Sequence, residues 1–276
     1  MRIRIIPDLH GSDWWKEEIK DIDELDHCIF LGDYVDDWDA KNEVIFKNLE
    51  EIISFKKEYM DKVTLLYGNH EFNYIHPYTG YCSGFRPTMK DSLGILLFEN
   101  KNLFQICKLI NISLPLYPFP QQKLLFSHAG FSKNWIKDNY YWINEEHWKT
   151  ISEEDWKKFK DFQLDNLEEV INNSFDSYTV LDKVMSISRL RGGCSPEGGP
   201  LWADTRETFN RYLLGYRQFV GHTPSMKVTT GSYPDRSPEN SSITFCDCGS
   251  KRVDITLDIT NFNIALIVNN ESTILC

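Results

Sequence analysis

Residues 3–11 read Ile3-Arg4-Ile5-Ile6-Pro7-Asp8-Leu9-His10-Gly11, a short and mostly apolar run followed by a cluster of polar and small residues. An apolar run of this length with turn residues behind it is typical of a buried β-strand. Because the side chains of an extended segment alternate between its two faces, Asp8 and His10 are expected on the same side. A carboxylate oxygen and an imidazole nitrogen placed in this way could bind one cation.

Later stretches repeat this arrangement of a short apolar run followed by polar and small residues. Their polar clusters are Gly32-Asp33, Gly68-Asn69-His70-Glu71, Ser127-His128-Ala129-Gly130 and Gly221-His222-Thr223-Pro224. Helical patterns lie between the early runs, at residues 13–24 and 42–60. This strand–helix–strand alternation predicts parallel strands joined by crossover helices. Because ligands bind beyond the carboxyl ends of strands in such sheets, all these clusters could converge on one site.

The donor atoms of the clusters suit a pair of divalent metal ions. Asp33 could bridge two cations with its two oxygens, and Asn69 offers a carbonyl oxygen. His128 and His222 offer imidazoles, so the set contains nitrogen and oxygen ligands without thiolates, which suits Mn, Fe or Zn. Two cations about 3.5–4 Å apart would lower the pKa of a shared water, and the resulting hydroxide could attack a phosphorus atom.

Each cluster on its own also has a simpler structural explanation. An aspartate at a strand end is often a turn residue, and a Gly-Asn-His stretch can be no more than a tight turn. The combination is much stronger, because four of the seven histidines lie in such clusters, namely His10, His70, His128 and His222. His70, oriented by Asp36, could protonate the leaving alkoxide.

The bulk composition predicts one large soluble domain. The chain has 276 residues and a formal net charge of −11, and repulsion of polyanions disfavours a broad nucleic-acid surface. No stretch reaches the roughly 18 apolar residues that span a membrane, and the N-terminus does not resemble a signal peptide. The seven scattered cysteines are expected to be free thiols, which favours a cytoplasmic protein.

The middle and the end of the chain have different patterns. Residues 132–185 are rich in aromatic and charged residues and predict a mainly helical insertion that could cap the site. Residues 229–242 predict an exposed loop. The alternating apolar residues that follow, from residue 243 onward, suggest antiparallel strands in a second sheet.

Taken in order, the polar clusters resemble those of the calcineurin-like metallophosphoesterases, most closely the phosphoprotein phosphatase branch in its bacterial and phage forms. The motifs that carry the resemblance cover residues 8–224 and are Asp8-Leu9-His10-Gly11, Gly32-Asp33-Tyr34-Val35-Asp36, Gly68-Asn69-His70-Glu71, Ser127-His128-Ala129-Gly130 and Gly221-His222-Thr223. The resemblance implies an α/β fold, a four-layer α/β/β/α sandwich with a mainly helical insertion, over a single domain of residues 1–276. It also implies a dinuclear centre of two divalent metal ions (Mn, Fe, Zn or Ni, with Mn favoured).

The same resemblance implies a role for each matching residue. Ligands of the first ion would be Asp8 and His10, and Asp33 would bridge both ions. Ligands of the second ion would be Asn69, His128 and His222. The acid pair would be His70 with Asp36, and Asp204, in the segment Leu201-Trp202-Ala203-Asp204, would lie near the metal-bound water.

Two positions depart from the family pattern. Family phosphatases usually have an arginine at the places of Asp37 and Tyr67, where the guanidinium groups clamp the terminal oxygens of a phosphomonoester. Arg206 is the best candidate for a remaining clamp. Other arginines could reach the site from loops, namely Arg86, Arg189 and Arg191.

Three functions therefore stay open. The leading one is hydrolysis of phosphomonoesters, on phosphoproteins or on small molecules. Loss of the two arginines motivates a second, a nucleotide or dinucleoside polyphosphate hydrolase or phosphodiesterase, with aromatic residues of the middle segment stacking on a base. The aromatic insertion also motivates a third, a metal-stabilised binding or scaffold protein. A phosphorylated substrate is the expected partner, and the oligomeric state is not predicted.

Overall fold

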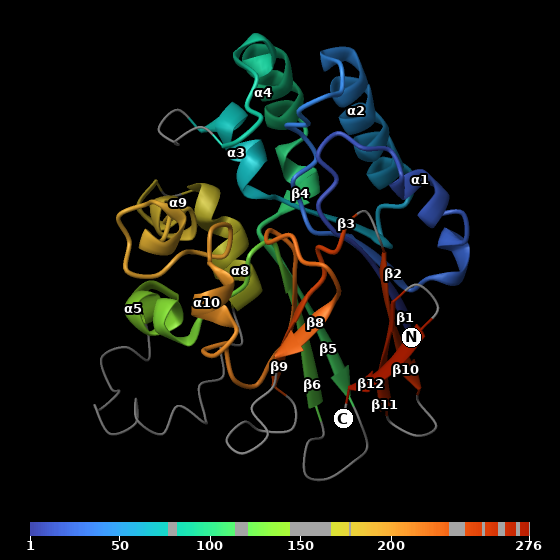
Figure 1. Ribbon diagram of the computed structural model, residues 1–276, viewed down its shortest axis with the longest axis vertical. Coiled ribbons are helices and arrows are strands. Elements are labelled where there is room, and N and C mark those ends of the chain that lie inside the picture. Colours follow the sequence, from blue (N-terminus) through green and yellow to red (C-terminus); the bar gives the residue numbers. More distant parts are fainter. Residues whose placement is uncertain are drawn as a thin grey trace. The chain divides into compact units, whose positions relative to one another are not determined.

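Two β-sheets, each with its own helices, make up this mixed α/β protein (Figure 1). The computed structural model describes residues 1–76, 82–113, 121–143, 167–176, 178–231, 241–249, 252–258, 263–268 and 271–275. The chain divides into two compact units. The first unit comprises Met1–Gln105, Val220–Thr229 and Phe245–Cys276, and the second comprises Ile106–Phe219 and Thr230–Thr244.

The first unit contains a seven-stranded sheet of order β12-β11-β10-β1-β2-β3-β4. Its strands are β1 (Arg2–Ile6), β2 (His27–Phe30), β3 (Val63–Leu66), β4 (Phe104–Gln105), β10 (Val253–Asp258), β11 (Asn263–Val268) and β12 (Glu271–Leu275). Its helices are α1 (Trp15–Glu18), α2 (Asn42–Glu58), α3 (Asn69–Ile75) and α4 (Lys90–Glu99), with the short 3₁₀ helices η1 (Ile22–Glu24), η2 (Pro87–Met89) and η3 (Lys101–Leu103).

The second unit contains a five-stranded sheet of order β5-β6-β7-β9-β8. Its strands are β5 (Cys107–Ser113), β6 (Gln121–Ser127), β7 (Arg217–Val220), β8 (Thr229–Gly231) and β9 (Ser242–Phe245). Its helices are α5 (Lys133–Ile143), α8 (Leu167–Asn172), α9 (Tyr178–Val184) and α10 (Thr205–Thr208), with the 3₁₀ helices η4 (Asn173–Asp176) and η5 (Arg189–Arg191).

The predicted parallel strands are confirmed in the first unit. β1 pairs with β2 and β2 with β3, both in parallel, so that Ile5 lies beside Ile29 and Ile29 beside Thr64. The helix predicted at residues 42–60 is α2, and an aromatic cluster joins it to the sheet. Trp15 of α1 lies 5.7 Å from Phe30 of β2 and 5.6 Å from Phe55 of α2, measured between ring centroids. This packing holds α1 and α2 against β2, and the parallel pairing places the carboxyl ends of β1, β2 and β3 at one edge of the sheet.

The prediction that the C-terminal strands belong to a second sheet is wrong for three of them. β10, β11 and β12 extend the first sheet, where β10 pairs antiparallel with β1. Alternating apolar residues predict a strand but not its partner. Arg4 of β1 gives one reason why β10 pairs with β1. It is a buried cation, and its Nε lies 2.8 Å from Asp254 Oδ1 of β10. A buried guanidinium requires a carboxylate partner, and β10 supplies one.

Other predicted segments are confirmed only in part. The helix predicted at residues 13–24 is reduced to α1 and η1. Within residues 132–185, the described residues are mainly helical, and residues 144–166 lie outside the described part. The predicted loop at residues 229–242 begins with β8, and residues 232–240 are also outside the described part. Among the described residues, no helix is both long and apolar enough to cross a bilayer.

Candidate metal centre

The polar residues predicted to follow strands do so in the structure. β1, β2 and β3 end directly before the segments that contain Asp8, Asp33 and Asn69. The loops after β1 and β2 are tied together, because the backbone N–H groups of Leu9 and His10 donate to the carbonyl oxygen of Asp33 over 3.0 and 2.7 Å. Neighbouring parallel strands thus deliver their polar ends to one place, as expected for an open α/β sheet.

Glu71 holds these loops in position, a role that the motif alone did not reveal. Its carboxylate is fully buried and accepts backbone N–H bonds from Asp33 over 3.0 Å, from Tyr34 over 2.8 Å and from Gly68 over 2.8 Å. Burial, together with the charge of Asp33, raises the pKa of Glu71 to about 7. The one available sequence signal was its place at the third position of α3, where a glutamate can complete a capping box.

Gly68 is required by the close approach of the loops after β2 and β3. A Cβ atom on Gly68 would lie 2.1 Å from Asp33 Oδ1, well inside van der Waals contact. Because Gly68 has no side chain, the Asp33 carboxylate can lie against the start of α3, where Oδ1 accepts the backbone N–H of His70 over 3.1 Å. The glycine of the Gly-Asn-His-Glu motif therefore makes room for the central carboxylate of the site.

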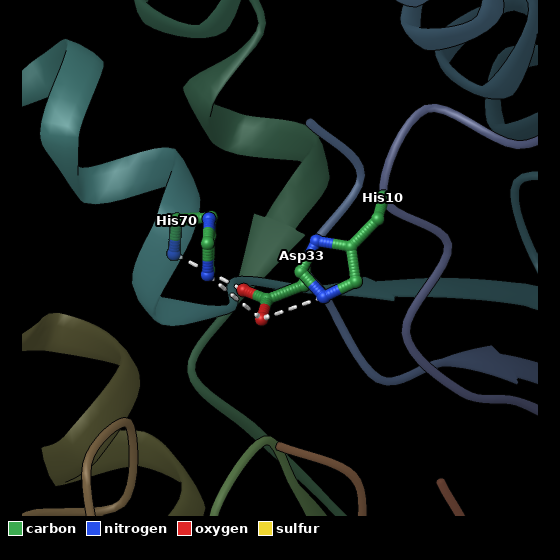
Figure 2. Close-up of side chains that lie close together, drawn as sticks. All are labelled: His10, Asp33 and His70. Atoms are coloured by element: carbon green, nitrogen blue, oxygen red, sulfur yellow. Dashed lines mark hydrogen bonds and ion pairs between the residues drawn. The ribbon is translucent and has the colours of Figure 1, made fainter. Parts of the chain in front are cut away.

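Asp33 lies between two imidazole rings. Its Oδ2 is 3.9 Å from His10 Nε2 and 3.8 Å from His70 Nε2, and the ligand atoms of these three residues all lie within 4.8 Å of one another (Figure 2). These separations are too long for hydrogen bonds. The separation from His10 Nε2 matches two ligands that each lie about 2 Å from one shared ion. Nitrogen and oxygen donors at this spacing fit a divalent metal ion.

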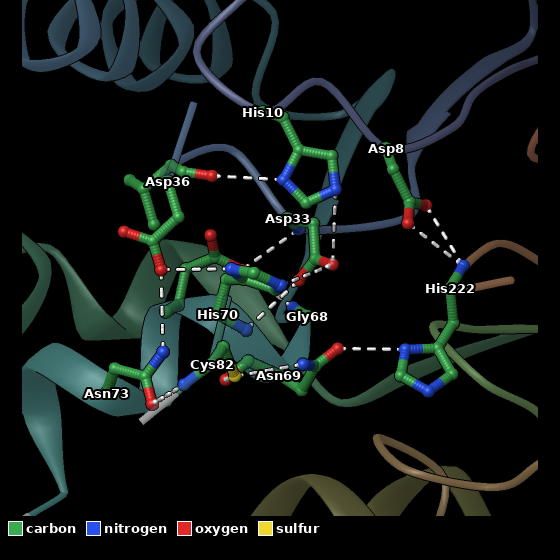
Figure 3. A network of polar contacts seen from close by, with 12 residues as sticks. Asp8, His10, Asp33, Asp36, Gly68, Asn69, His70, Asn73, Cys82 and His222 are labelled. Carbon is green, nitrogen blue, oxygen red and sulfur yellow. Dashed lines mark hydrogen bonds and ion pairs between the residues drawn. The ribbon is translucent and has the colours of Figure 1, made fainter. Parts of the chain in front are cut away.

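A second set of predicted ligands meets on the other side of Asp33. His222 offers a ligand atom within 4.8 Å of one on Asp33, and its Nδ1 lies 2.9 Å from Asn69 Oδ1. The backbone N–H of His222 donates to both oxygens of Asp8, over 3.1 and 3.0 Å (Figure 3). Asp33 is therefore shared by His10 and His70 on one side and by His222 on the other, which suggests a dinuclear site.

The expectation that Asp8 and His10 both lie on one extended segment is wrong. β1 ends at Ile6, and the backbone at His10 is left-handed, with φ of 44°. As a result, the carboxylate of Asp8 meets His222 while the imidazole of His10 lies beside Asp33 (Figure 3). The alternation of side chains applies only to an extended backbone, and the chain leaves that conformation before His10.

Left-handed backbone is concentrated at this site. Among the residues that the structure describes, the non-glycine residues with positive φ are His10, Asp33, Asp36 and His222, with values between 44° and 68°. Such conformations cost about 1–3 kcal/mol each and occur mostly where the surrounding structure enforces them at functional sites. All of them belong to the predicted centre.

The predicted acid pair is present in the first unit. His70 Nδ1 lies 2.9 Å from Asp36 Oδ2, and both side chains are largely buried. Burial lowers the pKa of His70, but the carboxylates of Asp33 and Asp36 outweigh it and raise the pKa to about 9. With Nδ1 directed to Asp36, the Nε2 atom is the one directed toward Asp33, so His70 can hold a proton at the edge of the site.

The second unit holds the remaining predicted residues. His128 follows β6 and is fully buried. Asp204 begins α10, and its carboxylate lies 3.0 Å from Arg191 Nε and 2.7 Å from Arg206 Nε. Burial raises the pKa of Asp204, but the hydrogen bonds from Arg206 outweigh it and lower the pKa. The two predicted arginines thus share the carboxylate of Asp204. These two arginines are called the Arg191–Arg206 pair below.

Arg86, in the first unit, has a structural task. Its Nη1 donates to Asn42 Oδ1 over 2.7 Å and its Nη2 to the carbonyl oxygen of Asp37 over 2.6 Å. These bonds tie the start of α2 to the segment that carries Asp36. Arg86 therefore supports the loop of the acid pair, a use that its place in the sequence did not indicate.

The match to a protein-family model agrees with this geometry. A family model described as calcineurin-like phosphoesterase matches residues 1–226. Among solved structures, the chain is similar to a protein serine/threonine phosphatase from Saccharomyces cerevisiae with similarity to human phosphatase PP5, at 14% sequence identity and a TM-score of 0.45, covering 99% of this chain and 79% of that chain. No curated protein matches the chain. The family match spans every residue of the candidate centre from Asp8 to His222.

Proposed function

Because this chain belongs to the calcineurin-like phosphoesterase family, we propose that it hydrolyses phosphomonoesters, on phosphoproteins or small molecules, at a dinuclear metal centre around Asp33. The observation that carries the proposal is the position of Asp33, whose Oδ2 lies 3.9 Å from His10 Nε2 and which has a ligand atom within 4.8 Å of one on His222. A carboxylate shared in this way suits the bridge of a two-ion site.

The first ion would be held by Asp8 and His10, and both ions by Asp33. Ligands of the second would be Asn69, His128 and His222. Two divalent ions bound there would neutralise phosphoryl oxygens and lower the pKa of a water molecule. Donors of this kind accept Mn, Fe, Zn or Ni, and we favour Mn. His70, oriented by Asp36, would give its Nε2 proton to the leaving oxygen.

Family membership also supports a finer description of the fold, in which both units form one domain with a four-layer α/β/β/α arrangement. His128 tests this description, because it belongs to the second unit whereas the other proposed ligands belong to the first. We expect His128→Ala to reduce bound Mn from about two ions per chain to about one, since the second ion loses an imidazole ligand. Metal analysis after gel filtration measures this, and His27→Ala, at a strand start, is the control. Unchanged metal content in His128→Ala would contradict the description.

The Arg191–Arg206 pair is our candidate for binding the substrate phosphate. Two guanidinium groups share the one carboxylate of Asp204, which leaves an excess positive charge. The Arg206 side chain is 65% exposed and keeps donors for a ligand. Arginine binds phosphate oxygens in a bidentate manner, so Asp204 would orient the pair for this contact.

A paired hydrolysis assay tests the function. The metal-free protein is loaded separately with Mn, Zn, Fe or Ni and given p-nitrophenyl phosphate or bis-p-nitrophenyl phosphate. We expect metal-dependent turnover of the monoester, with KM raised about tenfold in Arg206→Ala because a charged contact is lost. In His70→Asn we expect kcat to fall because the proton donor is lost. The fall should be only about tenfold, since p-nitrophenolate leaves with little help from an acid.

Arg211→Ala is the control for Arg206→Ala, because Arg211 is similarly exposed at 58% and pairs with a different carboxylate, that of Glu197. Its KM should be close to that of the parent protein. Absence of turnover of either substrate with every metal would refute the proposed function. Turnover of the diester that does not respond to Arg206→Ala would refute the monoester preference.

A nucleotide hydrolase is the second candidate, and one observation favours it. Trp38 is 74% exposed, two residues after Asp36, on a loop fixed by the hydrogen bond from the backbone N–H of Asp39 to Asp37 Oδ1, 2.7 Å long. An exposed indole on a fixed loop can stack on a nucleobase, a contact worth about 1–3 kcal/mol. Residues 144–166 of the segment that motivated the scaffold hypothesis lie outside the described residues.

We place the protein in the cytoplasm. Among the described residues, free thiols are found at Cys28, Cys82, Cys107 and Cys194. Thiols persist in a reducing compartment, which supports this location.

A further inference from the structure

Tyr74 has a phenol group that the proposed reaction does not use. Its side chain, on α3, is buried, and its hydroxyl donates a hydrogen bond to Asp36 Oδ1. The other oxygen of that carboxylate, Oδ2, lies 2.9 Å from His70 Nδ1. Asp36 therefore stands between a phenol on one side and the proposed acid on the other.

The neighbours of Tyr74 fix the direction of its hydrogen bond. The backbone N–H of Arg86 donates to Tyr74 Oη over 3.2 Å, so the phenol oxygen already acts as an acceptor. Burial and the bond to Asp36 raise the pKa of Tyr74, so the hydroxyl keeps its proton. The proton that remains is directed to Asp36.

The Asp36 carboxylate is held at both of its oxygens. Tyr74 binds Oδ1, while His70 Nδ1 and, over 3.4 Å, Asn73 Nδ2 approach Oδ2. A carboxylate held at only one oxygen can rotate about its last bond, and the imidazole that it orients would then lose its fixed direction. Holding both oxygens keeps His70 Nε2 directed toward Asp33, 3.8 Å from its Oδ2.

We propose that Tyr74 is a positioning residue for the acid of this enzyme, holding Asp36 so that His70 presents Nε2 to the leaving group. The assignment rests on the proposed function. In that reaction a water oxygen forms the new bond to phosphorus and the bond from phosphorus to the leaving oxygen breaks. The proton on His70 Nε2 moves to that oxygen, the attacking water releases one proton to solvent, and His70 takes up one proton from solvent before the next turnover.

A purely structural role for Tyr74 is the competing explanation, because its ring also packs against Phe85, with centroids 5.1 Å apart. Tyr74→Phe separates the two explanations, since it keeps the ring and removes only the hydroxyl. The test compares kcat for p-nitrophenyl phosphate, whose leaving group departs without a proton, with kcat for phenyl phosphate, whose leaving group needs one. We expect Tyr74→Phe to lower kcat for phenyl phosphate about tenfold and for p-nitrophenyl phosphate less than about twofold.

Tyr34→Phe is the matched control. Tyr34 is also buried in the first unit, and its hydroxyl donates to the carbonyl oxygen of Leu66 over 2.8 Å, away from the acid pair. This variant should change kcat for both substrates by the same factor, and bound Mn should equal that of the parent in both tyrosine variants. Equal losses on both substrates in Tyr74→Phe would overturn the positioning role.

His70→Asn separates this inference from the proposed function. It should lower kcat for phenyl phosphate by more than Tyr74→Phe does, on the order of a hundredfold. If His70→Asn lowered kcat for phenyl phosphate and for p-nitrophenyl phosphate by the same factor, the acid role and the positioning role would both be overturned. The proposed phosphoesterase activity would still stand. A parent protein that cleaves neither substrate would instead refute the proposed function itself.

Discussion

Replacing Asp33 with asparagine is expected to lower metal-dependent phosphomonoester hydrolysis on the order of a thousandfold. Asp33 is 2% exposed, and its two carboxylate oxygens make different contacts. Oδ1 accepts the backbone N–H of His70 over 3.1 Å. Oδ2 lies 3.9 Å from His10 Nε2 and 3.8 Å from His70 Nε2. Asparagine keeps the shape but removes the charge and one of the oxygens. A neutral amide cannot bridge two cations, so both ions should be bound weakly.

The same substitution should separate stability from activity. In the metal-free protein, Asp33 and Glu71 are two buried carboxylates whose charges repel each other, and the pKa of Glu71 is raised for this reason as well as by burial. Removing one charge relieves this repulsion but also removes the attraction between Asp33 and protonated His70, so metal-free Asp33→Asn should unfold at a temperature close to that of the metal-free parent. A metal ion at a free concentration of a hundred times its Kd stabilises the folded protein by about 2.7 kcal/mol. Asp33→Asn should lose that stabilisation.

Thermal unfolding with and without Mn, followed by kinetics on p-nitrophenyl phosphate, measures both effects. Asp39→Asn is the control, because Asp39 is an exposed aspartate of the same loop region. It should keep the metal-induced rise in Tm and the activity. An Asp33→Asn protein that gains as much Tm from Mn as the parent would contradict a metal centre at Asp33.

Sequence reasoning could group several candidate site residues because they follow a rule that is local. Short apolar runs end where polar residues begin, and neighbouring parallel strands must bring such ends together. The positions of Asp33 and Asn69 therefore follow from the order of residues along the chain. His222 follows β7 of the five-stranded sheet, so this rule does not account for its contact with Asn69. The contact between Asp36 and His70 is confirmed as well.

The features of the fold and the site that sequence reasoning missed depend on contacts between residues far apart in the sequence. A left-handed turn at His10 is enforced by hydrogen bonds to the loop after β2, so the alternation rule could not foresee it. The pairing of β10 with β1 depends on which strand edge is free and on the carboxylate that Arg4 needs. Arg86 binds Asn42, which lies 44 positions away, and nothing near either residue in the sequence indicates this bond.

Glu71 carries the second prediction of large effect, because its carboxylate joins the loops after β2 and β3. We expect Glu71→Gln to lower the free energy of unfolding by about 2–3 kcal/mol and kcat/KM about a hundredfold. Oε2 accepts the N–H groups of Asp33 and Gly68, and Oε1 accepts that of Tyr34. A glutamine must place its NH₂ group where one of these oxygens was, so in either orientation a donor faces a buried donor.

Glu207 offers a matched control from the second unit. It too is a buried glutamate in a capping box, but its hydrogen bonds, from the N–H groups of Asp204 and Gly198, both reach Oε2. Glutamine can keep its carbonyl oxygen at that position, so Glu207→Gln should cost less than about 1 kcal/mol. Urea unfolding of both variants measures the difference. If both variants lost the same free energy of unfolding, the loss would come from the buried carboxylate itself and not from the hydrogen bonds that Glu71 accepts from both loops. A larger loss of unfolding free energy in Glu71→Gln, together with weakened Mn binding, would show that the metal centre depends on a carboxylate that is not one of the proposed ligands.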